Sequence, residues 1–370
     1  MRKKKEKSYY YDLEQDIKNY PDAVFIFVIG GRGTGKTYST LKYLYKNRII
    51  FTFIKRTMDD IKLLCTGNKL GVKKEDDSPV IDCSPFKPLN RDFNTNVRAF
   101  QTYQSLGAFY NCDSKNNPVG NPVGYIAALS GISKVKGFDL SDSDVLFFDE
   151  YIPKIYDRNT ANEDVQILDM YKTISRDREH RGKAPLKFIA MANSDNIDSP
   201  LANAFNLVNE LATMVQNNQE YYYNPDTRVL IHKLKTSDEF IEKESQSPIY
   251  KATAGSKCAR MALENDFAFN DFSQIKKVNL KNMICEAKVF YNNKIHFVYY
   301  SPESAARYVT YSNYNKDPMI EFNLDKKTHI KKFCTYAENK VLQIYYGCDE
   351  PYFEKYDLYS LYINCRKKLL

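Results

Sequence analysis

The residues best suited to chemistry begin with a glycine-rich loop near the N-terminus of this 370-residue chain. The pattern G-x-x-x-x-G-K-[ST] is filled by Gly30, Gly35, Lys36 and Thr37, directly after an apolar run at residues 24–29. Glycines let the backbone curl so that N–H groups point at phosphate oxygens, and a following helix aims its positive end at the same charge. We therefore expect Lys36 to bind the phosphates of ATP and Thr37 to bind Mg²⁺. The residues expected to contact the nucleotide are Gly30, Gly31, Arg32, Gly33, Thr34, Gly35, Lys36, Thr37 and Tyr38.

Carboxylates at the end of a second apolar run form the other half of the candidate site. Asp149 and Glu150 directly follow residues 145–148. Phosphoryl transfer needs one carboxylate for the metal, and hydrolysis needs a second group to orient or deprotonate water. Asp149 fits the first role and Glu150 the second; an acidic strand end or helix start is the alternative interpretation. Asn193 ends a third apolar run and is expected to sense the γ-phosphate or hold the water, with a turn-forming role as the alternative.

A basic segment supplies a candidate arginine. Residues 161–175 show helical spacing and lead into the sequence SRDREHRGK. We expect Arg176 and Arg178 at the exposed end of this helix, where an arginine supplied across a subunit boundary can stabilise charge on the γ-phosphate. The alternative is surface arginines that pair with Asp177 and Glu179.

The elements that must position these residues alternate over the first 210 residues or so. Strands are expected at residues 24–29, 48–55, 145–148 and 186–192, with a helix at 37–46. This order predicts an α/β fold with a parallel sheet and helices on both faces, as in P-loop NTPases of the ASCE type. Residues 65–121 are rich in Gly, Pro, Asn and Asp, so we expect an insertion without helix there, with short strands near 97–103 and 125–129.

The second half of the chain has a different character. Residues 213–255 are polar and predict a linker or hinge with one short strand (228–234) and one charged helix (237–245). A hairpin with Asn292 and Asn293 at its turn, a third strand near 306–312 and a closing helix near 351–368 follow. We therefore divide the chain into residues 1–212, 213–255 and 256–370, the last a small α+β domain.

Composition narrows the class of protein. The chain is 43% hydrophobic, and its net charge of +8 is concentrated in clusters that would suit a polyanionic partner, although solvated surface is the default for any one cluster. No apolar run approaches the roughly 20 residues of a membrane span, and none follows the basic N-terminus as a signal peptide would require. The eight cysteines show no C-x-x-C pair, which argues against a zinc site or a disulfide framework. We expect a cytoplasmic protein without a membrane partner.

The segments FVIGGRGTGKTYS, FFDEY, ISRDREHR and IAMANS together carry a resemblance over roughly residues 20–210. They resemble the genome-packaging ATPases of small tailed bacteriophages that replicate by protein priming. The resemblance implies a homomeric ring, a pentamer, that pushes double-stranded DNA into a preformed capsid. It also implies work in the cytoplasm of an infected bacterium, docked on the procapsid, with the capsid portal and, as a further candidate, packaging RNA as partners.

The resemblance also assigns roles to single residues. Lys36 matches the loop lysine of that family, Asp149 the magnesium carboxylate, Glu150 the catalytic glutamate and Arg176 the arginine that acts in trans. Lys136 resembles a second basic residue of the family and is expected to contact the nucleotide.

Two features depart from the family pattern or leave it open. Lys55 and Arg56 match a basic position after the second strand, but Met58 stands where the family can carry a lysine. The C-terminal domain is similar to RNase H-type nucleases, which need several carboxylates around two ions. The acidic candidates are Glu286, Asp325, and Asp349 or Glu350, and the sequence does not show that they converge. The family's domain can lack this acidic cluster, and a protein-primed genome is already of unit length. The resemblance therefore implies a nuclease-like shell that binds DNA or packaging RNA without cutting.

Other functions use the same nucleotide-binding elements. A hexameric helicase or a plasmid-type DNA-transfer pump would act through the same core. A non-hydrolysing nucleotide switch would not need Glu150 beside Asp149. A small-molecule phosphotransferase would need a substrate pocket with lid arginines, in a shorter chain.

Overall fold

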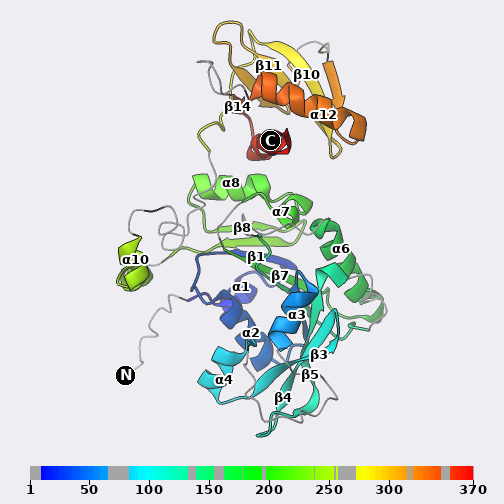
Figure 1. The fold of residues 1–370 in the computed structure, drawn as a ribbon, viewed down its shortest axis with the longest axis vertical. Helices are drawn as coiled ribbons and strands as arrows, with labels where there is room; N and C mark the ends of the chain where they lie inside the picture. The colour runs from blue at the N-terminus through cyan, green and yellow to red at the C-terminus, as the bar shows by residue number, and fades with distance from the viewer. Residues whose placement is uncertain are drawn as a thin grey trace. The chain divides into compact units, whose positions relative to one another are not determined.

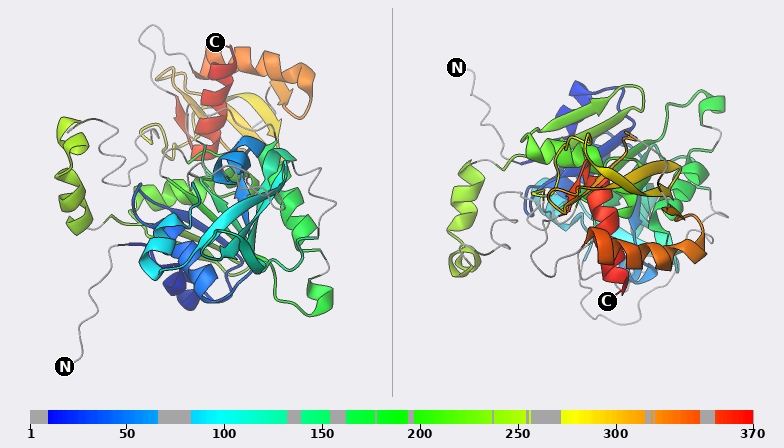
Figure 2. Two further views of the ribbon diagram at one scale, coloured as in Figure 1. Left: turned by 60° about the horizontal axis from the view of Figure 1, so that its bottom comes forward. Right: turned by 90° about the horizontal axis from the view of Figure 1, so that it is seen from above.

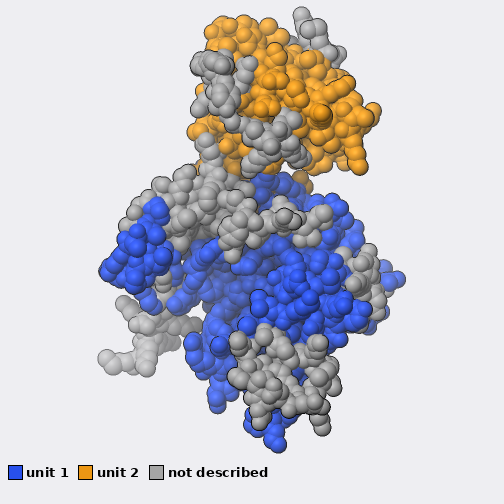
Figure 3. All heavy atoms as spheres, viewed as in Figure 1, with its two compact units in different colours: residues 1–205, 217–269 blue, residues 206–216, 270–370 orange. Residues whose placement is uncertain are grey.

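The computed structural model divides into two compact units, which are described separately (Figure 3). Unit 1 contains residues 1–205 and 217–269, and unit 2 contains residues 206–216 and 270–370. The described residues are 10–65, 83–131, 139–153, 162–176, 178–193, 197–236, 238–253, 256, 272–314, 318, 320–342 and 351–369. The expected division of the chain at residues 212 and 255 stays a prediction.

Unit 1 is built on a nine-stranded sheet with the order β3-β4-β5-β2-β6-β7-β1-β9-β8. Strands β5, β2, β6, β7, β1 and β9 run parallel, β4 and β8 run antiparallel to them, and β3 pairs antiparallel with β4 (Figures 1 and 2, β3 to β5 in cyan). The sheet is therefore mixed around a parallel centre. The strands are β1 Phe25–Ile29, β2 Phe51–Lys55, β3 Val97–Tyr103, β4 Leu106–Cys112, β5 Pro118–Ala128, β6 Val145–Asp149, β7 Lys187–Ala192, β8 Tyr221–Asn224 and β9 Val229–Lys233.

Helices cover both faces of this sheet, which explains why its central strands are apolar on both sides. On one face Ile26 and Val28 of β1 share a core with Leu41 and Leu44 of α2. On the other face Phe25 lies against the rings of Tyr171 in α6 and of Phe205. The helices of unit 1 are α1 Leu13–Asn19, α2 Lys36–Lys46, α3 Met58–Cys65, α4 Lys87–Phe93, α6 Glu163–Ile174, α7 Pro200–Ala204, α9 Asp238–Ser245 and α10 Pro248–Ala252, with 3₁₀ turns at Leu129–Gly131 and Glu179–Arg181.

Two regions differ from the sequence expectation. Helix α4 lies in the region where we expected no helix. A proline stands in its first turn and left-handed Asn94 follows its last turn. Both residue types are common in loops, but they are also common at the two ends of short helices. Residues 213–255, expected as a linker, supply β8 and β9, and β9 pairs in parallel with β1. That pairing joins residues about 200 positions apart, so no local sequence pattern predicts it.

Unit 2 is a five-stranded sheet with the order β13-β10-β11-β12-β14 and helices packed on it. The predicted hairpin β10–β11 is confirmed: Asn292 and Asn293 at its turn have φ of 48° and 58°, as a type I′ turn requires. Val289, Val298 and Val309 of the sheet share a core with helical residues. The elements are α8 Val208–Gln216, β10 Ile284–Tyr291, β11 Lys294–Tyr300, β12 Arg307–Thr310, β13 Ile320–Asn323, α12 Lys327–Tyr336, a π-helical turn Ala337–Val341, β14 Tyr352–Phe353 and α13 Tyr356–Leu369.

None of the helices among the described residues combines the length and apolar character that crossing a membrane requires.

Arg178 joins the end of α6 to the start of β6. It is 3% exposed, and its guanidinium donates to the carbonyl of Ser143 at 2.6 Å, to Asp144 Oδ1 at 2.7 Å and to the carbonyl of Ala184 at 3.1 Å. The expectation that Arg178 lies exposed was wrong, because its guanidinium is drawn inward by the buried carbonyl of Ser143 and by the acceptors of Asp144 and Ala184, to which it supplies several donors in one plane.

We expect Arg178→Met to lower the free energy of unfolding by about 3 kcal/mol, because the buried carbonyl of Ser143 loses its donor and Asp144 loses its ion pair. Urea unfolding of the full chain measures the change. Arg181→Met, at an exposed arginine three positions along, is the matched control and should change stability by less than about 0.5 kcal/mol. Equal losses in the two variants would contradict the structural role of Arg178.

Candidate functional site

The predicted phosphate-binding loop joins β1 to α2 at the carboxyl ends of the parallel strands. Gly33 and Gly35 both have φ of +77°, a left-handed conformation that glycine adopts at no steric cost. Gly30 packs so closely on Leu234, which follows β9, that an added Cβ would lie 2.6 Å from its Cδ1 atom. The loop therefore needs glycine for its curvature and for its contact with the neighbouring strand.

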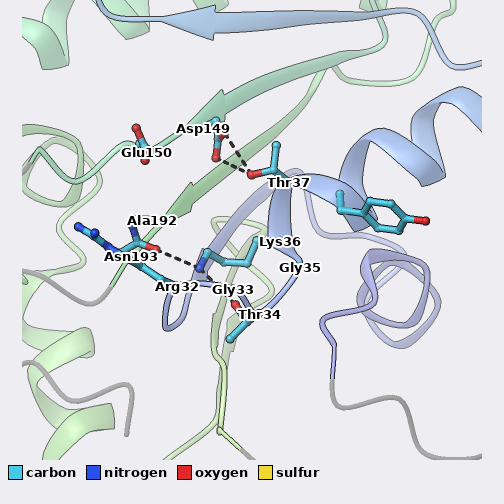
Figure 4. A pocket seen from close by; sticks show the side chains of 11 residues that line it. Arg32, Gly33, Thr34, Gly35, Lys36, Thr37, Asp149, Glu150, Ala192 and Asn193 are labelled. Carbon is cyan, nitrogen blue, oxygen red and sulfur yellow. Dashed lines mark hydrogen bonds between the residues drawn. The ribbon is translucent and has the colours of Figure 1, made fainter. Parts of the chain in front are cut away.

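Lys36, the first residue of α2, is buried inside this loop. Its Nζ atom donates to the carbonyls of Gly30 and Gly31 at 2.8 Å each. The same atom lies 3.3 Å from Asn193 Oδ1 (Figure 4). Asn193 directly follows β7, so the strand-end amide and the loop lysine meet although 157 positions separate them. The ammonium group is held where the loop curls around it.

Thr37 and Asp149 form the next contact of the site. The Thr37 hydroxyl lies 3.1 Å from both carboxylate oxygens of Asp149, at the end of β6 (Figure 4). Burial raises the pKa of Asp149 above its ordinary value, against the opposing effect of the nearby Lys55 charge; the charge of Glu150 raises it further. A hydroxyl and one carboxylate are the oxygen ligands by which Mg²⁺ is held beside phosphates, so these residues fit that ion.

Glu150 stands in a strained conformation beside Asp149. Its φ is +61°, a region that costs a non-glycine residue about 1–3 kcal/mol. The next residue, Tyr151, is fully buried, and its N–H donates to the carbonyl of Met191 in β7 at 2.9 Å. The backbone therefore turns sharply at Glu150 while its side chain stays exposed at the site.

A cavity of about 370 Å³ lies between these groups (Figure 4). Gly30 and Gly31 contribute carbonyls that bind Lys36. Lys136, expected to contact the nucleotide, lies outside the described residues. The residues that line the cavity are Arg32, Gly33, Thr34, Gly35, Lys36, Thr37, Tyr38, Asp149, Glu150, Ala192 and Asn193.

Arg176 does not reach this cavity within one chain. Helix α6 starts at Glu163 beside the end of β2, and its other end is held to the start of β6 by Arg178. Arg176 is exposed at that second end, near the amino-terminal ends of the parallel strands, whereas Asp149 lies at their carboxyl ends. The five-residue strand β6 alone separates its two ends by about 13 Å, at about 3.3 Å per residue.

Residues that sequence reasoning did not assign support the site from behind. Arg56, matched from the sequence to a basic family position but given no role, binds Glu163 at 2.9 Å and the carbonyl of Tyr151 at 2.8 Å. The N–H of Tyr11 donates to the carbonyl of Thr34 in the loop at 3.0 Å. An acidic first turn is common to many helices, so Glu163 carried no signal of its own.

Comparison with known proteins places the chain in a family. The sequence model of the podovirus DNA encapsidation protein (Gp16) family matches residues 114–341, more than half of the chain. No curated protein sequence matches the chain.

Two solved structures are similar along nearly the whole chain. The structure of the bacteriophage Phi-29 viral genome packaging motor assembly is 17% identical, with a TM-score of 0.60, over 98% of this chain and 100% of that one. The structure of the Phi-28 gp11 DNA packaging motor is 18% identical, with a TM-score of 0.57, over 97% of this chain and 96% of that one. At these identities the likeness shows the fold.

The extent of the family match decides the assignment. It begins before β6 and ends beyond α12, so it includes the carboxylate pair and most of unit 2. The prediction of a phage genome-packaging ATPase is confirmed. The chain belongs to the podovirus DNA encapsidation protein family.

Proposed function

We propose that this chain is an ATP-driven translocase that moves double-stranded DNA into a preformed viral capsid. The observation that carries the proposal is the meeting of Lys36, Thr37, Asp149 and Glu150 at one cavity, in a member of a DNA encapsidation family. These are the groups that bind phosphate, hold a metal ion and activate water. The loop is, in this proposal, the P-loop of an ASCE-type ATPase.

Each residue has a defined task in this proposal. Lys36 exchanges its contacts with the carbonyls of Gly30 and Gly31 for β- and γ-phosphate oxygens of ATP. Thr37 and Asp149 would hold Mg²⁺, which would supply positive charge beside the β- and γ-phosphates. Glu150 orients the attacking water and accepts its proton. Asn193, already beside Lys36, senses the γ-phosphate.

The position of Arg176 favours a ring. Since Arg176 and Asp149 lie at opposite ends of the parallel strands, the charge of Arg176 can stabilise a γ-phosphate only on a neighbouring copy of the chain. Head-to-tail contact between copies closes into a ring when the rotation allows it. We propose a homomeric pentamer that docks on the procapsid portal in the cytoplasm of the infected bacterium, with packaging RNA as a further partner, and Lys136 as a second nucleotide contact.

Unit 2 is, in this proposal, an RNase H-like shell without nuclease activity. The parallel pairing of β13 with β10 beside an antiparallel meander supports the fold. Glu286 is bound to Arg307 at 2.9 Å and 3.3 Å, which occupies the carboxylate with a cation of the chain itself. Asp325 accepts a hydrogen bond from the N–H of Asn292 at 3.4 Å, and Asp349 and Glu350 lie outside the described residues.

The alternatives make different demands. A hexameric helicase or DNA-transfer pump with the same core would respond to single strands or to other partners. A nucleotide switch would not need the strained backbone that presents Glu150 to the cavity. The family match favours encapsidation of DNA over unwinding or transfer.

Glu150→Gln tests the central step. We expect ATP binding to persist and kcat to fall about 10²- to 10⁴-fold, because the amide cannot accept the proton of water. Steady-state ATPase is measured with and without double-stranded DNA, with exposed Glu303→Gln as the matched control. Unchanged turnover would move the base to another residue, and stimulation by single strands alone would favour a helicase.

Mixing two inactive variants tests the shared site. A Lys36→Ala subunit cannot bind ATP but still offers Arg176, whereas an Arg176→Ala subunit binds ATP and offers none. In an equal mixture about one quarter of the head-to-tail interfaces combine an intact loop with an intact arginine, so ATPase activity should return. A mixture of Lys36→Ala and Arg181→Ala is the control with a fully intact partner arginine. No recovery at any ratio would exclude action of Arg176 in trans.

Asp149→Asn should stabilise the nucleotide-free chain and remove its response to magnesium. Burial raises the pKa of Asp149, so the folded state disfavours the ionised form, and its charge at neutral pH lowers stability. Thermal unfolding measures the effect, with exposed Asp226→Asn as control. The gain from Mg²⁺-ATP, about 2.7 kcal/mol at 100 times Kd, should vanish in the variant.

In the unchanged chain the same gain should fade as pH falls toward the raised pKa, at a higher pH than an ordinary aspartate would allow. A lower melting temperature of nucleotide-free Asp149→Asn would contradict the destabilising role of the charge.

A further inference from the structure

An ion pair behind the candidate site joins two elements that the sequence keeps far apart. Arg56, directly after β2, binds Glu163, the first residue of α6, through Nε at 2.9 Å and Nη2 at 3.2 Å. The two side chains are 15% and 0% exposed. Removing two charges from water costs about as much as their attraction returns, so stability alone does not explain such a pair.

The same guanidinium also holds the backbone that carries Glu150. Nη2 of Arg56 donates to the carbonyl of Tyr151 at 2.8 Å, and the guanidinium carbon lies 5.3 Å from the centre of the Phe148 ring. Tyr151 directly follows strained Glu150, and its N–H is bound to Met191. A strained residue keeps its conformation only when its surroundings hold it there, and Arg56 supplies one of these contacts.

Helix α6 extends this connection to Arg176. The helix runs from Glu163 to Ile174, about 18 Å at about 1.5 Å per residue, and Arg176 comes two positions after its end. Since a helix moves as a stiff element, a shift of Glu163 displaces the far end as well. The start of α6 is tied to Glu150 through Arg56, and its end presents the arginine.

We propose that Arg56 and Glu163 are positioning residues that couple Glu150 of one site to Arg176, which serves the neighbouring site. The inference rests on the proposed hydrolysis at Glu150 and action of Arg176 in trans. When Glu150 and the peptide after it move, Arg56 carries the movement to Glu163, and α6 carries it to Arg176. The order of hydrolysis around the ring would then depend on this pair.

The competing explanation is an ion pair that only stabilises the fold. Unit 2 offers a matched control, because Arg307 and Glu286 form the same two-bond pair at 2.9 Å and 3.3 Å, with side chains 11% and 23% exposed. A purely structural role predicts similar behaviour of Glu163→Gln and Glu286→Gln. The coupling role predicts a loss of turnover in Glu163→Gln alone.

The first experiment measures steady-state ATPase of the full chain with double-stranded DNA, below the melting temperature of every variant. We expect Glu163→Gln and Arg56→Lys to lower kcat about 10- to 100-fold, since about 1 Å of misplacement can cost that much, with KM for ATP changed less than about twofold. Lysine keeps the charge of Arg56 but not its paired bonds. Glu286→Gln should keep the kcat of the unchanged chain.

The second experiment isolates the path to Arg176. A subunit with Lys36→Ala already lacks a working site and contributes only its arginine to an Arg176→Ala partner. Adding Glu163→Gln to the Lys36→Ala subunit should therefore lower the restored activity of the mixture several-fold. Adding Glu286→Gln to the same subunit should leave the restored activity unchanged.

The outcomes separate the inference from the proposed function. Unchanged kcat in Glu163→Gln, an equal loss in Glu286→Gln, a parallel rise of KM, or unchanged recovery in the second experiment would each overturn the coupling role. Those results would leave the ATPase assignment intact. A chain without ATPase activity, or with full activity in Glu150→Gln, would overturn the proposed function together with the inference.

Discussion

Parallel pairing of the neighbouring strands β6, β7 and β1 is the constraint on which the rest of unit 1 depends. Strand β7 pairs with β1 so that Ala192 lies opposite Ile29, and with β6 so that Met191 lies opposite Asp149. Because parallel strands end at the same edge, the residues after them meet although they are far apart in the chain. A shift of register by one residue would turn every side chain of a strand to the other face. The cavity exists because this register is held by apolar residues buried on both faces.

Strands and helices were predictable wherever the signal was local. Buried runs gave the positions of β1, β6 and β7, and two asparagines gave the turn of the β10–β11 hairpin. Strand β9 was not assigned to the sheet, because its partner β1 lies about 200 residues away. A short stretch of sequence does not indicate which distant strand it will pair with. Helix α4 was missed for the opposite reason, since its bounding proline and asparagine are also loop residues.

The candidate site divides in the same way. Lys36, Thr37, Asp149 and Glu150 were predictable because their chemistry is written in short contiguous motifs, and the structure brings all four to one cavity. The residues behind them were not, because Arg56 and Glu163 are 107 positions apart and each alone resembles an ordinary surface charge. Arg178 shows the same limit: its alternation with acidic residues suggests an exposed side chain, but its guanidinium is buried and donates to the buried carbonyl of Ser143. Pairing between distant charges depends on the sheet, which no single segment encodes.

The energetic features of the site fit an enzyme whose resting state is incomplete. Glu150 holds a strained backbone conformation, and burial disfavours the charge of Asp149. Both features lower the stability of the nucleotide-free chain, and a bound cation would offset the second of them. Arg176, whose charge is proposed to stabilise the γ-phosphate, lies near the opposite ends of the strands in the same copy. If that arginine acts in trans, nucleotide binding and assembly are linked, because each completed site needs the ligand on one copy and the arginine from the next. A single chain would then bind ATP and hydrolyse it slowly, and rapid turnover would be a property of the ring.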